Sequence, residues 1–250
     1  MLYGLWNSAA GALTSSYQHD VIANNLANVD TVGFKSDLAT FTSRKTEVKE
    51  GNGSAKFTNR LLEQYGGGIF AAPNHTDFAP AANIKTSNPY DVAIKGDGFF
   101  QVQKGDQTMF TRDGRFAARD GMLVTQESNL PVLDINGDPI VVDAKFPITI
   151  SKSGLITQEG TNNGANLGIV DFADKQVLTK QGQNLYTTDG VDGTLKANVH
   201  VTQGALESSG VKPTEQFVSM IKNQRLLETN LKMLKLQDES LGKLIRQFSS

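Results

Sequence analysis

The stretch FVSMIKNQRLLETNLKMLKLQDESLGKLIRQF, residues 217–248, decides the fold of this chain. Within this stretch, ten residues follow one another at alternating spacings of three and four positions, and eight of the ten are apolar. This is the a/d pattern of a coiled-coil helix. The ten positions are Phe217, Met220, Gln224, Leu227, Leu231, Leu234, Asp238, Leu241, Ile245 and Phe248. Pro213 and Thr214 suit a helix start, so the sequence predicts a helix over 214–247.

A second helix is predicted over residues 2–28, at the other end of the chain. Ser16 and His19 interrupt its apolar stripe, and the small residues at 9–12 would let another helix approach closely. The stripe is narrow because half of it is alanine or polar. Its residues are Leu2, Leu5, Ala9, Ala12, Ala23 and Leu26.

Three asparagines lie where this helix ends, in the stretch VIANNLANVDTVGFKSD. Asparagine is a mediocre helix former, because its amide competes for backbone hydrogen bonds. We interpret Asn24, Asn25 and Asn28 as side chains that satisfy backbone groups where the helix meets the next segment. Gly33 permits a backbone conformation closed to other residues. The signature turn comprises Asn24, Asn25, Asn28, Thr31, Gly33 and Phe34, the last as an apolar anchor.

In the middle of the chain, apolar and polar residues alternate with a period of two. Short alternating stretches are broken by Asp97-Gly98, Asp113-Gly114, Asp120-Gly121 and Asn136-Gly137, which favour tight hairpins. We therefore expect an antiparallel β region over about 88–203. Residues 37–82 are polar or rich in Gly, Pro and Ala, and are interpreted as an extended or flexible connector.

Composition excludes several function classes. The net charge of −2 gives no sign of a nucleic-acid partner, and no stretch of 18 apolar residues predicts membrane insertion. The chain has no cysteine, and its first residues lack the pattern of a secretory signal. The sequence contains neither the motif of a nucleophile elbow nor that of a phosphate-binding loop. Its three histidines do not have the spacing of metal ligands. We expect no catalytic, cofactor-binding or metal site, hence no enzyme.

Four ordered blocks carry a resemblance to a known family: IANNLANVDTVGFK, SNPYDVAIKGDGFFQVQ, FTRDGRFAARDGMLVT and VTQGALESSGVKPTEQFVSMIKNQR. Together they resemble the bacterial flagellar rod and hook proteins. The resemblance implies a structural subunit of the basal-body rod, a hollow helical drive shaft that transmits torque across the periplasm. It also implies terminal helices paired as a coiled coil, with a central antiparallel β domain outside them.

The resemblance further implies the partners and the location. These would be copies of the chain, other rod subunits and the flagellar type III export apparatus, which exports subunits without signal cleavage. The modest insert before the β domain favours a proximal-rod subunit, with a distal-rod subunit as the alternative. A periplasmic adaptor or scaffold is the alternative from another class; a β-rich enzyme or a surface adhesin is a more distant one.

The expected fold is mostly β with α. Residues 1–36 and 205–250 would form a discontinuous helical polymerisation domain, 37–82 the connector, and 83–204 the antiparallel β domain. A lone helix of this kind is marginal in water, so we expect neighbouring subunits to complete the packing of both ends. The residues assigned to that polymerisation seam are Leu2, Leu5, Ala9, Ala12, Leu26, Phe217, Met220, Leu227, Leu231, Leu234, Leu241, Ile245 and Phe248.

Overall fold

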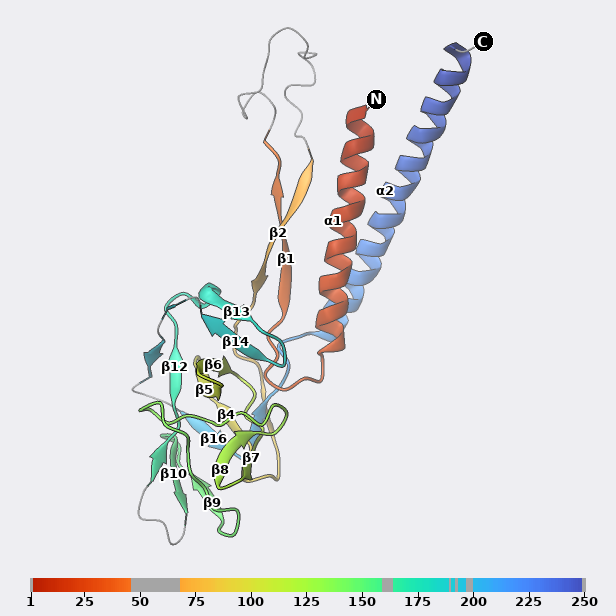
Figure 1. The fold of residues 1–250 in the computed structure, drawn as a ribbon. Helices are drawn as coiled ribbons and strands as arrows, with labels where there is room; N and C mark the ends of the chain where they lie inside the picture. The colour runs from red at the N-terminus through yellow and green to blue at the C-terminus, as the bar shows by residue number, and fades with distance from the viewer. Residues whose placement is uncertain are drawn as a thin grey trace. The chain divides into compact units, whose positions relative to one another are not determined.

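The structure is a computed structural model that describes residues 2–45, 68–158, 164–188, 190–191, 193–196 and 200–248. It is a mixed α/β chain with one long helix near each terminus and an antiparallel β region between them (Figure 1). The predicted class is confirmed at this level. Among the described residues, no helix has the length and apolar character needed to cross a membrane.

The described residues form two compact units. The helical unit takes the described residues within 1–27, 37–75 and 212–250, and the β unit takes those within 28–36 and 76–211. The sequence analysis placed 28–36 with the helices, but Gly33 donates a backbone hydrogen bond to the carbonyl of Glu207, 2.9 Å away, in the β unit. The turn after the first helix is therefore tied to the sheets.

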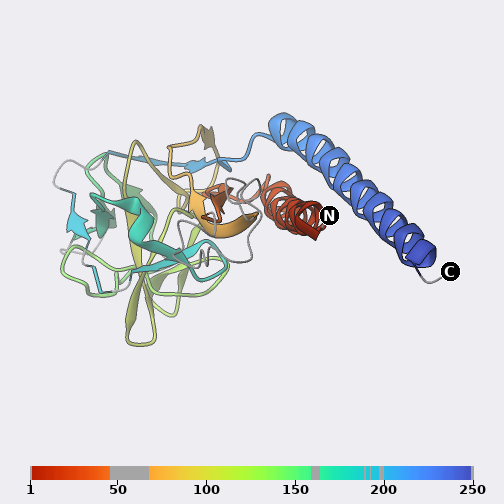
Figure 2. The ribbon, with the colours of Figure 1, turned by 90° about the horizontal axis from the view of Figure 1, so that it is seen from above.

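Two helices and a hairpin make up the helical unit. Helix α1 spans Leu2–Ala27, and α2 spans Pro213–Phe248, close to the predicted bounds. Pro213 suits the first helical position, where its missing N–H costs no hydrogen bond. The helices run side by side, as views from the front and from above show (Figures 1 and 2). Strands β1 (Asp37–Ser43) and β2 (Ile69–Thr76) pair with each other.

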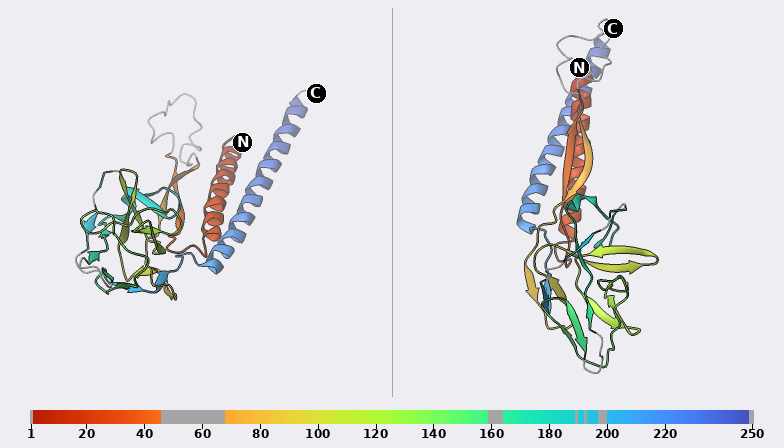
Figure 3. Two further views of the ribbon diagram at one scale, coloured as in Figure 1. Left: turned by 60° about the horizontal axis from the view of Figure 1, so that its bottom comes forward. Right: turned by 90° about the vertical axis from the view of Figure 1, so that its left-hand side faces the viewer.

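The first strand of this pair lies against α1. The ring of Phe41 meets that of Tyr17 edge-on, 6.5 Å between centroids, and a Cβ on Gly68 would touch that of Ala10. Helix α1 thus lies between the β1–β2 hairpin and α2 (Figures 1 and 3). In the described part of the expected connector, residues 37–43 and 69–76 form the paired strands; residues 46–67 lie outside the described residues.

Every strand pair in the β unit is antiparallel. The largest sheet has the order β13-β14-β6-β5-β12-β15, beside sheets β11-β10-β9, β16-β4, β17-β3 and β7-β8. The bounds of the first strands are β3 Asn83–Lys85, β4 Val92–Ile94, β5 Phe99–Lys104, β6 Gln107–Thr111, β7 Phe116–Arg119 and β8 Met122–Thr125. Those of the following elements are β9 Ile148–Ile150, β10 Leu155–Gln158, β11 Ala165–Asn166, β12 Ile169–Asp171, the 3-10 helix η1 Lys175–Val177 and β13 Leu178–Lys180. The last are β14 Leu185–Thr188, β15 Thr194–Leu195, β16 Val201–Gln203 and β17 Ala205–Glu207.

Two apolar clusters fill the β unit. One packs aliphatic side chains such as Val102 and Leu123 around Phe100 and Phe116, and all four are almost completely buried. The other is aromatic and is built around Phe99 and Tyr186. The unit thus has its own core, as an independently folded domain requires. The hairpin predicted at Asp120-Gly121 joins β7 to β8.

Candidate subunit interface and signature turn

Asn25 fastens the end of α1 to the start of β1. Its amide oxygen accepts a hydrogen bond from the N–H of Asp37 at 2.9 Å, and its Nδ2 donates to the carbonyl of Asp37 at 2.7 Å. The side chain is buried, so no water need complete these bonds. An amide is one of the few side chains that can donate and accept at the same backbone residue. This explains one asparagine at the helix end.

Asn28 and Thr31 shape the turn that follows. The side-chain oxygen of Asn28 accepts from the hydroxyl of Thr31 at 3.1 Å, and its carbonyl accepts from the N–H of Thr31 at 3.2 Å. The hydroxyl of Ser209, on the chain leading to α2, donates to that same carbonyl at 2.8 Å. This hydrogen bond therefore joins the turn to the segment between β17 and α2.

Gly33 is required by conformation and by space. Its φ is +68°, in the left-handed region, and a Cβ would lie 2.6 Å from the carbonyl carbon and oxygen of Arg112. Phe34 then enters the β unit, where it is buried, and the Lys180 ammonium lies 4.4 Å from its ring centroid. Its backbone carbonyl accepts from the N–H of Gly210 at 2.8 Å.

A buried ionic triad lies beside this turn. Lys35, Arg112 and Glu207 are at most 3% exposed. Glu207 Oε1 accepts from Lys35 Nζ and from the Ala81 N–H, both at 2.8 Å, and Oε2 accepts from Arg112 Nε. The guanidinium also donates to the carbonyls of Gly96 and Gly98. One carboxylate thus gathers segments that lie far apart in the sequence.

Burial and neighbouring charge set the pKa values of this triad. Burial opposes ionisation of Glu207, but the charges of Arg112 and Lys35 outweigh it, so the pKa of Glu207 lies below its ordinary value. Burial lowers the pKa of Lys35, and the charge of Glu207 offsets only part of that shift. Two buried cations therefore depend on one carboxylate.

Side-chain amides of α2 face α1 at three positions along their interface. A Cβ on Gly4 would lie 2.9 Å from the amide nitrogen of Gln237, and one on Gly11 at the same distance from that of Asn230. Asn223 Nδ2 donates to the carbonyl of Ser15 at 2.7 Å. The close approach predicted at residues 9–12 is thus found at Gly11, and the helices run antiparallel.

No cluster of three or more His, Asp or Glu side chains placed to hold a metal ion occurs in the part of the chain that the structure describes. A groove does lie on the helical unit, and most of its lining is apolar.

Comparison with known proteins decides the family. Three family models match in order along the chain: "Flagella basal body rod protein" at 7–35, "Flagellar hook protein FlgE/F/G D1 domain" at 93–158, and "Flagellar basal body rod FlgEFG protein C-terminal" at 202–247. The flagellar basal-body rod protein FlgG of Bacillus subtilis is 35% identical over an alignment that covers 98% of both chains. The chain belongs to the flagellar basal-body rod protein family.

Other relatives agree with this membership. The rod protein FlgF of Caulobacter vibrioides is 34% identical and covers 89% of this chain and 88% of its own. The hook-basal body complex protein FlhP of Bacillus subtilis is 29% identical, covering 90% and 91%. As a rod protein, the chain is a structural subunit of the flagellar basal body that assembles with other axial subunits.

The structure places the predicted seam of this rod protein on two faces of α2. Met220, Leu227, Leu234 and Leu241 are partly covered, whereas Phe217, Leu231, Ile245 and Phe248 are exposed. Within the chain, α1 instead contacts the neighbouring positions Asn223, Asn230 and Gln237. The residues of α2 that contact α1 within the chain are thus neighbours of the predicted seam residues and not the seam residues themselves. Leu227, Leu234 and Leu241 are partly covered, and they lie between the face of α2 that contacts α1 and its exposed face.

The predicted N-terminal residues lie along α1. Ala12 is buried, and Leu5, Ala9 and Leu26 are half-buried. Leu2 begins the helix, but its side chain lies outside the described part. In the signature turn, Asn25, Gly33 and Phe34 are buried, Asn28 and Thr31 partly so, and Asn24 is exposed.

Sequence reasoning missed the ionic triad and the amides facing α1. Lys35, Arg112 and Glu207 all lie inside the blocks that carried the family resemblance. Each has a polar neighbour in the sequence, Ser36, Thr111 or Ser208, so no local pattern marks these charges as buried. The amides Asn223, Asn230 and Gln237 recur every seven residues, three positions after Met220, Leu227 and Leu234, and this second periodicity also marks a helix interface.

Leu234 and Leu231 give a matched test of which face α1 covers. Leu234 lies between Asn230 and Gln237 on the covered face, whereas Leu231 is 51% exposed. We expect Leu234→Ala to lower the unfolding free energy of the helical unit by about 1–2 kcal/mol, since the site is only half-buried. Leu231→Ala should change it by less than about 0.5 kcal/mol. Denaturant unfolding followed by circular dichroism at low concentration measures both; equal losses would contradict the assigned face.

Proposed function

We propose that this rod protein polymerises helically into the hollow drive shaft that carries torque across the periplasm. In the polymer, the helical unit would form the polymerising part, with terminal helices packed as coiled coils against those of neighbouring subunits. The observation that carries this proposal is the pair of long terminal helices, whose apolar residues are only partly covered within one chain. The predicted polymerisation residues are the same set: Leu5, Ala9, Leu227, Leu231 and their companions on the two stripes.

Export by the flagellar type III apparatus, without a cleaved signal, belongs to the same proposal. It rests on family membership and on the way a rod must be built outside the inner membrane. The subunit acts by packing, and we assign it no catalysis and no cofactor.

We further propose a proximal rather than a distal place in the rod. The support is the sequence interpretation of a modest insert before the β domain. The identities of 35% to FlgG and 34% to FlgF do not separate the two relatives.

Deletion of the gene in its own organism tests the proposed function. We expect loss of swimming and of complete basal bodies, both restored by a plasmid-borne copy, because an axial polymer cannot extend past a missing subunit. Soft-agar spreading and electron microscopy of isolated basal bodies provide the measurements. Normal basal bodies in the deletion strain would favour the adaptor or scaffold alternative.

A further inference from the structure

Glycine is an unfavourable residue in the interior of a helix, because it loses more conformational freedom on folding than any other residue. The two helices of this chain contain three glycines, Gly4 and Gly11 in α1 and Gly242 in α2. For the first two, the packing of the chain supplies a reason. A Cβ on either would lie 2.9 Å from an amide nitrogen of α2, so each glycine leaves room for a side chain of the facing helix.

Gly242 has no such reason within the described residues. Its backbone is helical, so no left-handed φ calls for glycine. A Cβ there would meet a single atom within 4 Å, Nη2 of Arg246 at 3.8 Å, one turn further along the same helix. No side chain of α1 fills the space that this glycine leaves, so the space is available to a side chain of another molecule.

Gly242 lies where α2 extends past the start of α1. Gly4, near that start, faces Gln237. From there α1 continues for about 3 Å, whereas Gly242 lies about 7 Å further along α2. The ribbon shows α2 passing the start of α1 (Figures 1 and 3). The end of α2 thus continues the α1–α2 interface beyond α1, and Ile245 and Phe248 on it are 67% and 88% exposed.

Gly242 is also one corner of a hole of the kind that coiled coils use. In a coiled coil, a side chain of one helix packs among four residues of the facing helix. These residues are neighbours on the helix surface, at spacings of three, four and seven positions. Along the predicted seam of α2, the third corners of the successive holes are Ile221, Glu228, Lys235 and Gly242. Only the last hole has a corner without a side chain, so it accepts the largest partner; its corners are Asp238, Leu241, Gly242 and Ile245.

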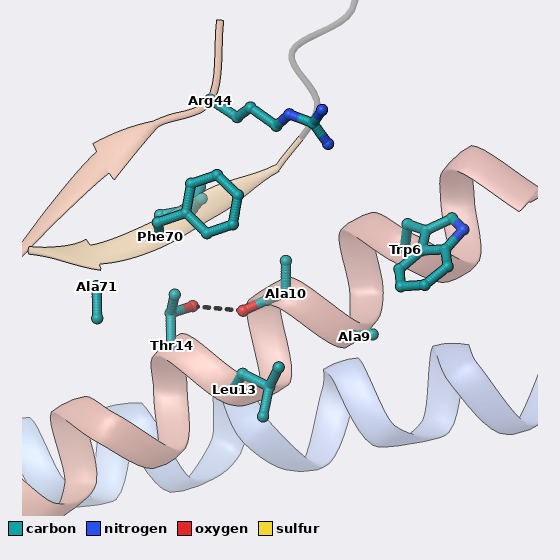
Figure 4. Close-up of a pocket in the computed structure, with 9 residues that line it drawn as sticks. Trp6, Ala9, Ala10, Leu13, Thr14, Arg44, Phe70 and Ala71 are labelled. Carbon is teal, nitrogen blue, oxygen red and sulfur yellow. Dashed lines mark hydrogen bonds between the residues drawn. The ribbon is translucent and has the colours of Figure 1, made fainter.

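Trp6 is the largest side chain that the helical unit exposes. It is 68% exposed and is the only tryptophan of the chain. Figure 4 shows its ring projecting from α1, at the apolar groove of the helical unit. The residues three and four positions further on, Ala9 and Ala10, are small, so the ring stands above its neighbours on that face. Tryptophan is favoured at the centre of protein interfaces, where its ring is buried.

We propose that Trp6 of one copy packs over Gly242 of a second copy. The ring contacts Leu241 and Ile245, and the indole N–H, which needs an acceptor when buried, donates to the Asp238 carboxylate. This inference rests on the proposed function and names one pair of surfaces that the polymer uses. The end of α2 continues a helix–helix interface, so a helix is its natural cover, and α1 of a second copy offers one with an exposed apolar face. In a rod the contact repeats head-to-tail, because a closed pair cannot extend into a polymer.

Exchanging side-chain size across the contact tests it in the full-length chain, expressed in the deletion strain. Gly242→Leu fills the hole, and Trp6→Ala removes the side chain that occupies it. We expect each single variant to lose complete rods and swimming. The double variant W6A/G242L, in which leucine fills the space that the indole vacates, should recover swimming that neither single variant shows. Soft-agar spreading and electron microscopy of isolated basal bodies measure both.

Neither substitution should damage the subunit itself. Leucine at position 242 has open space and is a better helix former than glycine, and the Trp6 side chain is mostly exposed. Circular dichroism of the purified full-length variants should therefore show undiminished helix content. The matched controls Ser240→Leu and Asn7→Ala change exposed residues that are close in sequence but outside the hole and its occupant, and should swim as the unaltered chain does.

Tryptophan fluorescence gives a second readout, which is specific because the chain has one tryptophan. In a dilute solution of the purified full-length chain, the emission should be that of an exposed indole. In a concentrated solution it should shift to shorter wavelength, because association buries the ring. The G242L chain should show no such shift at the same concentration.

The outcomes separate this inference from the proposed function. Normal rods in either single variant, or emission that stays that of an exposed indole in concentrated solution, would overturn the contact between Trp6 and Gly242. Loss in both single variants without recovery in the double variant would also overturn it, since the two residues would then face different partners, such as another axial subunit. Equal loss in the matched controls would do the same. The proposed function would still stand in each case, provided the unaltered gene restores rods in the deletion strain.

Discussion

Replacing Glu207 by glutamine is expected to destabilise the β unit by about 3–5 kcal/mol, the cost of leaving buried charges uncompensated. The amide keeps the size and hydrogen-bonding shape of the side chain but removes its charge. Lys35 and Arg112 then remain as two buried cations, and among the described residues no other carboxylate forms an ion pair with them. Hydrogen exchange of the amides of β4–β6, measured on the full-length chain, reports this loss.

The matched control is Glu127→Gln. The Glu127 carboxylate lies 2.9 Å from the Arg115 guanidinium, but its side chain is 49% exposed. An exposed ion pair contributes about 0–1 kcal/mol, so the control should lose little protection. Equal effects of the two variants would contradict the role given to burial in the triad.

The same carboxylate gives the unaltered chain a signed pH dependence. Burial raises the pKa of Glu207, but the two cations beside it outweigh that effect, so the pKa in the folded state lies below its ordinary value of 4.5. A carboxylate of this kind stabilises the folded state above its unfolded pKa, and this stabilisation is lost as pH falls through the folded pKa. The protection lost by E207Q relative to the unaltered chain should therefore shrink below about pH 4.5. A difference that stays constant to pH 2 would contradict the assignment.

The substitution Gly33→Val is expected to abolish rod assembly. Left-handed backbone costs a residue with a Cβ about 1–2 kcal/mol, and that Cβ would overlap the carbonyl of Arg112 at 2.6 Å. Main-chain atoms cannot move aside as a flexible side chain can, so we expect a total of about 3 kcal/mol or more. Soft-agar swimming and hydrogen exchange at residues 28–36 measure the effect.

Gly105→Val is the matched control for Gly33. Gly105 lies in the turn between β5 and β6 with φ +61°, and a Cβ there would meet nothing within 4 Å. Valine at position 105 has the same conformational cost of a left-handed backbone as valine at position 33, but its Cβ overlaps no other atom. We expect G105V to swim and G33V not to; normal rods in G33V would refute the role of the turn.

The two long helices and the antiparallel region were predictable because both rest on local periodicity. The apolar residues spaced by three and four from Phe217 predict a helix, and Asp120-Gly121 predicts a hairpin; neither prediction needs information about residues distant in the sequence. Family membership was also within reach, because the four blocks are short and ordered. These features need only neighbours in sequence.

Two other features depend on partners that a local pattern does not reveal. Lys35 and Glu207 are 172 positions apart, and their pairing follows from the path of the chain through the β unit. The face of α2 that meets α1 is ambiguous in sequence, because the leucines at 227 and 234 border two possible interfaces. The glycines at 4 and 11 decide between them, since only they leave room for the amides of Asn230 and Gln237.

The central claim is that this rod protein is an essential segment of the axial drive shaft. Electron cryo-tomography of motors in the gene-deletion strain tests it most directly. The account predicts motors with an incomplete rod and no hook or filament, and the point where the rod ends separates a proximal from a distal subunit. Motors with a complete rod and a normal filament would contradict it.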